Sequence, residues 1–168
     1  FVDLLINIQK IEKKIGIKLS HKQNFIEYSP LAINYLKIIS KKINYKGGGI
    51  LIIDYGSSDK NMKNTLQSVS GHKYNHVLNN IGESDITHCL NFKIIEKIVQ
   101  KLKLQVRGFT NQKSFLKNLG IFERAEIISK NLPFSKKADI YYRIKRLTDE
   151  SAMGKLFKVM FITKKNAK

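Results

Sequence analysis

A run of four branched apolar residues, Ile50 to Ile53, lies between a glycine cluster and the sequence Asp54-Tyr55-Gly56. Because apolar and polar positions do not alternate in this run, the pattern predicts a strand buried on both faces, as in a parallel sheet between layers of helices. In open sheets of this kind ligands bind beyond the carboxyl ends of the strands, where Asp54, Tyr55 and Gly56 are expected to lie. The alternative is that Asp54 only begins a turn and Tyr55 only packs.

Apolar residues on either side of this run have the spacing of helices. Ser29 followed by Pro30 predicts a helix start, since Ser is a good N-cap and Pro is tolerated at the first helical position. The glycines that begin at Gly47 are expected to end this helix. Asn91 is the expected N-cap of a later helix, and residues 1–15 are loosely helical in pattern. The apolar positions of the two capped helices are Ala32, Leu36, Ile39 and Ile43, and Phe92, Ile95, Val99 and Leu102.

The remaining segments predict an irregular connection, two more strands and a helical insertion. The polar stretch after Gly56 predicts a long connection of little regular structure, which in a compact unit is usually disordered or functional. Gln105–Thr110 is the next predicted strand. Residues 112–147 are expected to be helical, and Lys155–Thr163 alternates as a final strand that we expect to be antiparallel.

This order of elements predicts the fold class α/β. It corresponds to the C-terminal half of a doubly wound sheet with a helical insertion and a final antiparallel strand. We expect residues 1–168 to form one partial domain, and the opening on Phe1 rather than Met is consistent with a piece of a longer protein.

The amino-acid composition limits the kinds of molecule that this protein is expected to bind. Lys and Arg total 31 against 13 Asp and Glu, a formal net charge of +18 that fits polyanions, acidic proteins or simple solubility. A nucleic-acid partner is disfavoured, because the lysines are scattered and the preferred phosphate and base reader, Arg, occurs at only four positions. The one cysteine, Cys89, excludes an internal disulfide and suits a reducing compartment. No apolar run approaches the roughly 20 residues that a membrane span requires.

Several polar side chains could carry chemistry. The histidines and Cys89 do not have the paired spacing of a metal site, and no Gly-x-Ser-x-Gly nucleophile elbow occurs. Neighbouring side chains such as His88 and Cys89 point to opposite faces if they lie in a strand, which argues against a catalytic dyad. Polar residues near the expected ligand edge could act as acid–base or substrate groups, or could anchor loops through hydrogen bonds. They are Asp54, His72, Glu83 and Asp85.

An ordered set of motifs over residues 27–161 resembles the MidA family of S-adenosylmethionine-dependent methyltransferases, bacterial relatives of a mitochondrial complex I assembly factor. The motifs include Glu27-Tyr28-Ser29-Pro30, Gly48 to Gly56, Thr65-Leu66-Gln67, Gly71-His72-Lys73-Tyr74, Gly82 to Thr87, Leu119-Gly120-Ile121 and Met153 to Val159. The resemblance implies a seven-stranded methyltransferase sheet in which Ile50–Asp54 is the fifth strand. The fourth strand would precede this chain, so Ile50–Ile53 would form an unprotected apolar edge.

The resemblance also implies a function and a set of site residues. It implies methyl transfer from S-adenosylmethionine to a protein arginine, in connection with respiratory complex I, with the cofactor loop upstream of this chain. The implied partners are the upstream half of the enzyme and a protein substrate such as a complex I subunit. The implied location is the bacterial cytoplasm or, alternatively, the mitochondrial matrix. The expected catalytic residues are Asp54 and Tyr55, and the expected substrate-binding residues are Gly56, His72, Glu83, Asp85, Thr87 and Gln112.

Two departures from the family bear on activity. The glycine-rich cofactor loop and the Asn-Glu and Asp-Ala motif that precede the matched region are absent, so this chain alone is expected to be inactive. Cys89 stands where the family has His, which removes an ionisable ring, and Asn91 stands where the family has Asp, which preserves an N-cap. A non-catalytic remnant that binds a protein partner is therefore the alternative function.

Overall fold

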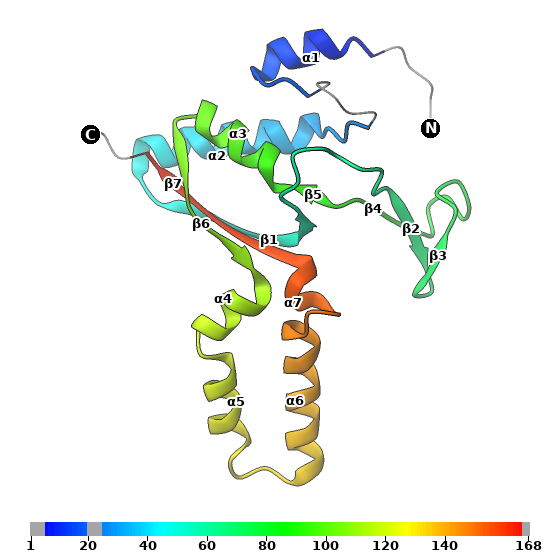
Figure 1. The fold of residues 1–168 in the computed structure, drawn as a ribbon, viewed down its shortest axis with the longest axis vertical. Coiled ribbons are helices and arrows are strands. Elements are labelled where there is room, and N and C mark those ends of the chain that lie inside the picture. The colour runs from blue at the N-terminus through cyan, green and yellow to red at the C-terminus, as the bar shows by residue number, and fades with distance from the viewer. Residues whose placement is uncertain (1–5, 20–24, 166–168) are drawn as a thin grey trace.

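The computed structural model describes residues 6–19 and 25–165, and its centre is a four-stranded mixed sheet (Figure 1). The strand order is β5-β1-β7-β6, with β7 antiparallel to both of its neighbours and β5 parallel to β1. The strands are β1 (Gly49–Ser57), β5 (Leu90–Asn91), β6 (Leu104–Asn111) and β7 (Phe157–Lys164). The predicted strands and the antiparallel last strand are therefore confirmed.

Helices α2 (Pro30–Lys46) and α3 (Phe92–Lys101) cover one face of this sheet, and α1 (Ile8–Ile15) lies beyond them (Figure 1). The predicted caps are confirmed. The Ser29 hydroxyl accepts from the Ala32 N–H at 3.2 Å, and the Asn91 side chain accepts from the Ile94 N–H at 3.1 Å. The backbone turns out of α2 at Gly47, where φ is +82°.

Two buried apolar clusters hold these layers together. One lies under α1 and joins it to α2 and α3; it contains Ile15, Ile17, Leu19, Ile33, Met62 and Ile98. The other lies between the helices and the sheet; it contains Ile43, Phe92, Val99, Leu104, Met160 and Ile162. The apolar face predicted for α3 is confirmed, whereas in α2 Ile33 is buried and Ala32 and Ile39 are exposed.

The expectation that Ile50–Ile53 is buried on both faces is wrong. Leu51 and Ile53 are 50% and 45% exposed, and Phe161, the partner of Leu51 on β7, is 44% exposed, although Val159 opposite Ile53 is buried. Successive residues of a strand point to opposite faces, and among the described elements α2 and α3 cover only the face of Ile50 and Ile52. The outer face of the sheet is thus apolar and open around Leu51, Ile53 and Phe161.

The long connection after β1 is more regular than expected. It forms a second, antiparallel sheet with the order β3-β2-β4, beyond the carboxyl end of β1 (Figure 1). Its strands are β2 (Gln67–Ser70), β3 (Lys73–Asn75) and β4 (Asp85–Thr87). They escaped prediction because strands of three or four polar residues carry almost no hydrophobic alternation.

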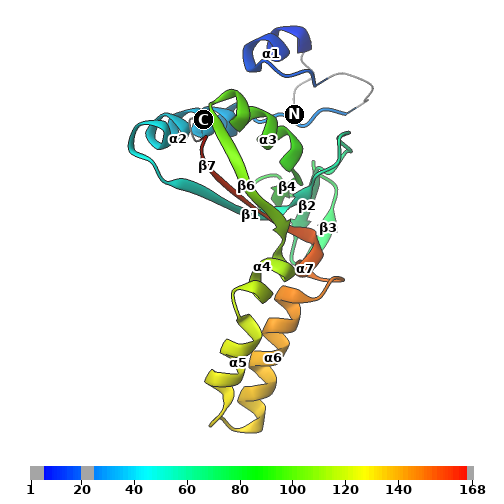
Figure 2. The ribbon, with the colours of Figure 1, turned by 60° about the vertical axis from the view of Figure 1, so that its left-hand side comes forward.

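The predicted helical insertion forms an arm that projects away from the main sheet (Figures 1 and 2). The arm contains α4 (Gln112–Asn118), α5 (Ile121–Ser129) and α6 (Phe134–Thr148), and α7 (Met153–Leu156) leads back into β7. Lys155 and Leu156 therefore belong to a short helix rather than to the start of the last strand. At the base of the arm, the Lys113 ammonium lies 2.8 Å from the Glu150 carboxylate. Hydrogen bonds from Ser151 lower the pKa of the adjacent Asp149 carboxyl.

Candidate functional site

A hydrogen-bonded cluster lies beside the carboxyl end of β1, where the chain before α2 meets the chain after β1. The Thr65 hydroxyl and backbone N–H both donate to one carboxylate oxygen of Glu27, at 2.6 and 3.0 Å. The same hydroxyl accepts from the Cys89 N–H at 2.9 Å. Thr65 therefore ties together three segments that are distant in the sequence.

The thiol of Cys89 is electrostatically coupled to this cluster. Its pKa is raised, first because burial disfavours the thiolate and next because the Glu27 carboxylate repels the negative charge. A hydrogen bond with Thr65 opposes this shift, and Asp54 adds a smaller repulsion. Cys89 therefore remains a neutral thiol near neutral pH, unlike an activated nucleophile.

His88 does not form a dyad with this thiol. Its ring nitrogen Nδ1 lies 3.2 Å from the backbone carbonyl oxygen of Cys89, and the imidazole is exposed. Within residues 6–19 and 25–165, no group of three or more His, Cys, Asp or Glu side chains is placed to hold a metal ion.

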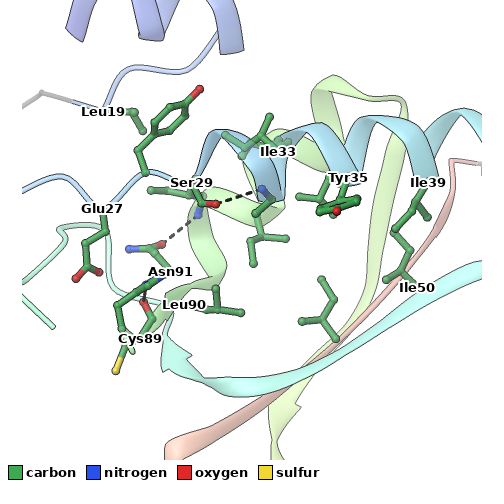
Figure 3. A pocket seen from close by; sticks show the side chains of 18 residues that line it. Leu19, Glu27, Ser29, Ile33, Tyr35, Ile39, Ile50, Cys89, Leu90 and Asn91 are labelled. Atoms are coloured by element: carbon green, nitrogen blue, oxygen red, sulfur yellow. Dashed lines mark hydrogen bonds between the residues drawn. The ribbon is translucent and has the colours of Figure 1, made fainter. Parts of the chain in front are cut away.

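A cavity of about 360 Å³ opens between α2, α3 and β1, next to the cluster (Figure 3). Tyr35 and Ile39 of α2 form one wall, and Ile50 of β1 lies opposite them. Apart from Tyr35, the labelled polar lining residues lie at one end of the cavity, where Glu27 and Cys89 are found (Figure 3). The rest of the lining is almost entirely aliphatic, as in an unfilled part of a hydrophobic core.

The two predicted catalytic residues lie on opposite faces of β1. Asp54 follows Ile50 and Ile52 on the face covered by helices, and its carboxylate accepts from the Tyr55 N–H at 2.8 Å. Tyr55 points to the outer face, where its ring meets that of Phe157 edge-on at 5.7 Å. Only Asp54 is therefore directed toward the Glu27–Thr65–Cys89 cluster.

Gly56 and Thr87 have clear local contacts. At Gly56 the strand passes so close to β5 that an added Cβ would collide with the Leu90 carbonyl group. The Thr87 hydroxyl accepts from the Gln67 amide at 3.1 Å and so links β4 to β2. Thr87 is two residues before Cys89, which places it at the rim of the cluster.

The other predicted substrate-binding residues are dispersed. His72 lies in the exposed turn between β2 and β3, and Glu83 and Asp85 are exposed near the start of β4. Gln112 is buried at the base of the arm, where its amide donates to the Leu147 carbonyl at 2.9 Å. The structure therefore does not gather these four side chains around Asp54.

Sequence reasoning did not assign Glu27, Thr65 or Cys89 to a site. Glu27 and Thr65 occur in the quoted motifs, but nothing in their spacing indicates that they bond to each other. Glu27 and Cys89 each lie two residues before a predicted helix N-cap, Ser29 and Asn91, whereas Thr65 lies within the predicted irregular connection.

Comparison with known proteins identifies the family. Residues 3–110, more than half of the chain, match the family described as "Putative S-adenosyl-L-methionine-dependent methyltransferase". The chain belongs to this methyltransferase family.

Curated mitochondrial proteins are among the relatives of this chain. The chain is 28% identical over 137 residues to protein arginine methyltransferase NDUFAF7 of Xenopus tropicalis, covering 81% of this chain and 31% of that protein. It is 31% identical over 112 residues to the Mus musculus protein, covering 67% of this chain and 25% of that protein. The chain thus spans about a third or less of the length of these curated relatives.

Two solved structures from Burkholderia thailandensis share the fold. An uncharacterized protein superposes with a TM-score of 0.78 at 19% identity, covering 99% of this chain and 46% of that chain. A second protein, bound to S-adenosyl-homocysteine, superposes with a TM-score of 0.66 at 23% identity, covering 82% of this chain and 37% of that chain. The fold is that of a class I methyltransferase.

The described residues do not by themselves fit the family's cofactor. S-adenosylmethionine carries a carboxylate, an ammonium and ribose hydroxyls, each of which requires a polar partner when bound. The cavity offers mainly aliphatic walls, which supply no such partners.

Proposed function

We propose that this chain is the C-terminal part of an S-adenosylmethionine-dependent protein arginine methyltransferase. Its cofactor site would be completed by an upstream part of the enzyme, and its acceptor would be an arginine of a protein such as a respiratory complex I subunit. The named relatives support a protein arginine as acceptor. The cytoplasm of a bacterium or the mitochondrial matrix is the location consistent with the relatives.

The free edge of β1 is the observation that carries this proposal. On one side β1 pairs with β7 from Gly49 to Tyr55, but on the other side the strands described pair only at Gly56 and Ser57, with β5. The unpaired N–H and C=O groups along that edge can accept another strand. Because β5 already pairs with this edge of β1 in the parallel orientation, a further strand could pair in the same orientation along the rest of the edge.

Exposed apolar side chains on both faces of the sheet, beside the free edge of β1, support association with an upstream part of the enzyme. On the helix-covered face, Tyr35 and Ile39 border the aliphatic cavity and are 57% and 39% exposed. On the outer face, Leu51 and Phe161 are exposed. Uncovered apolar patches on a sheet are typical of surfaces that another polypeptide covers.

Asp54 is the residue we propose to orient the acceptor guanidinium. A carboxylate can hold a guanidinium through two parallel hydrogen bonds, which would fix the direction of the reacting nitrogen. Asp54 lies in the C-terminal half of β1 beside the polar cluster, whereas the other predicted carboxylates, Glu83 and Asp85, are exposed in and after the turn before β4.

Calorimetric titration with S-adenosylmethionine tests the proposal. The chain is titrated alone and then mixed with the N-terminal part of a family member. We expect binding, followed by methylation of an arginine peptide, only in the mixture. Binding by neither sample would contradict the proposal and favour the alternative of a non-catalytic module that binds a protein partner.

A matched pair of variants tests whether the N-terminal part associates at the free edge of β1, rather than responding to any added surface charge. Leu51→Lys places a charge on the open outer face beside the free edge and is expected to weaken association with the N-terminal part. Ile81→Lys, at an exposed position outside the main sheet, is the control and should associate normally. Asp54→Asn should keep cofactor binding in the mixture but lower methyl transfer; unchanged transfer would exclude the role proposed for Asp54.

A further inference from the structure

The far end of the helical arm combines exposed apolar side chains with uncompensated positive charge. The arm tip, defined as residues 127–137, covers the end of α5, the turn and the start of α6. It contains three lysines and no acidic residue. In Figures 1 and 2 it is the part of the arm farthest from the sheet, on the side away from α1 and α2.

The apolar residues of the tip do not belong to the hydrophobic core. Phe134 is 86% exposed and Ile127 is 68% exposed, and Leu132 between them is 38% exposed. The turn is nevertheless held in place, because the Leu132 N–H donates to the Ser129 carbonyl and the Lys136 N–H donates to the Pro133 carbonyl, both at 3.0 Å. The exposed side chains are thus presented by a fixed backbone.

The lysines of the tip are available for an external anion. They are Lys130, Lys136 and Lys137, and none of them takes part in the ion pairs found among the described residues. The nearest acidic side chains along the chain are Glu126 and Asp139, and Asp139 is already paired with Arg143 at 3.0 Å. The positive charge of the tip is therefore not neutralised by the arm itself.

We propose that the arm tip docks on an anionic lipid bilayer, with Phe134 and Leu132 entering the interfacial region and the three lysines binding lipid phosphates. Apolar side chains flanked by lysines are the combination that binds to negatively charged membrane surfaces. None of the helices in the described ranges is long and apolar enough to cross a membrane, so the contact would be peripheral. The proposal is independent of the methyltransferase function.

Charge and composition favour a bilayer over other occupants. Two copies of the tip packed together would bring six lysines into contact without an acidic partner, so a second copy is disfavoured. A nucleic acid is disfavoured because the tip has no Arg and because, apart from Phe134, its apolar side chains are Ile, Leu and Pro, which do not stack on bases as aromatic rings do. An acidic protein surface is the competing occupant and is an outcome of the test.

The absence of tryptophan from the chain permits a direct test. Phe134→Trp introduces a single reporter at the tip, and Tyr45→Trp introduces one at a position that is also 86% exposed, near the end of α2. Each protein is mixed with vesicles of phosphatidylcholine and phosphatidylglycerol, and separately with pure phosphatidylcholine. We expect a blue-shifted emission and quenching by brominated lipid only for Phe134→Trp on the anionic vesicles.

Vesicle co-sedimentation then measures the contribution of each group. Phe134→Ser is expected to weaken binding to anionic vesicles about tenfold or more. Lys130→Gln with Lys136→Gln should weaken it about 30-fold, whereas the matched pair Lys41→Gln with Lys42→Gln on α2 should have a clearly smaller effect. Because all of these side chains are exposed, the variants are expected to fold.

Three results would overturn the proposal. One is an equal spectral response of the two Trp reporters, which would indicate non-specific attraction by the net charge. Another is vesicle binding that does not change in Phe134→Ser. The third is binding of soluble polyglutamate that is as tight as vesicle binding and equally sensitive to the tip substitutions, which would favour an acidic protein.

Discussion

The hydroxyl of Thr65 donates to the carboxylate of Glu27 across 2.6 Å, and so fixes the segment before α2 to the segment after β1. The same oxygen accepts from the Cys89 N–H, so one small side chain satisfies groups on two other segments. Such a network positions the end of β1 and the entry to β5 relative to each other. The polar cluster therefore has a structural role whatever it binds.

Replacing Thr65 by Val should destabilise the protein. The substitution keeps the size of the side chain but leaves the Cys89 N–H without its acceptor and removes one donor from Glu27. Loss of part-buried hydrogen bonds, one of them to a charged group, should cost about 1–3 kcal/mol in the free energy of unfolding. Urea denaturation measures the change. Thr163→Val, which removes an exposed hydroxyl bond to Arg107, is the control and should stay within about 0.5 kcal/mol.

Gly56→Ala should separate β5 from β1. The added methyl group would meet the Leu90 carbonyl and the ring of Phe92, both held by the packing around them, so the strands would have to move apart. We expect a loss of about 1–3 kcal/mol, comparable to other overpacked sites. Gly108→Ala in β6 is the matched control, since nothing lies within 4 Å of its added methyl group. Equal stability of the two variants would contradict the close approach at Gly56.

The raised pKa of Cys89 predicts a shifted alkylation profile. Because burial and the Glu27 carboxylate disfavour the thiolate, iodoacetamide should react only at a higher pH than with the unfolded chain. Glu27→Gln removes the repelling charge, so the pKa should fall and the profile should move to lower pH. The single cysteine makes the label unambiguous. Glu83→Gln, at a carboxylate that does not influence Cys89, should leave the profile in place, and a shift there would argue against the specific role of Glu27.

The main sheet could be predicted because its signals are local or strongly patterned. Ser29, Gly47 and Asn91 cap helices through contacts with their own neighbours, so their roles follow from the sequence alone. The exposure of Leu51 could not be predicted in the same way. An apolar run indicates that a strand tends to be buried on both faces. It does not indicate whether the residues that cover each face are among those that the structure describes.

The site could be predicted only in part. Asp54 was expected beyond the carboxyl end of a strand, but it lies inside β1, paired with Lys158 and followed by Tyr55 to Ser57 of the same strand, on the face of the polar cluster. The contact between Glu27 and Thr65 depends on the path of two irregular segments, and no periodicity specifies that path. Gln112 was predicted to bind substrate, but its side chain is buried at the base of the arm, where it donates a hydrogen bond to the Leu147 carbonyl. Its position at an element boundary did not distinguish these two roles.

The position of β7 in the middle of the sheet has a consequence for biosynthesis. This strand is the last element of the described chain, yet it is the hydrogen-bonded neighbour of both β1 and β6. During translation, β1 would leave the ribosome long before β7. Its apolar side chains would stay exposed until the arm and β7 had been translated. Pairing over such a long sequence separation is slow to form. During that interval the nascent chain would depend on protection from aggregation, and chaperones would be expected to bind at Ile50–Ile53.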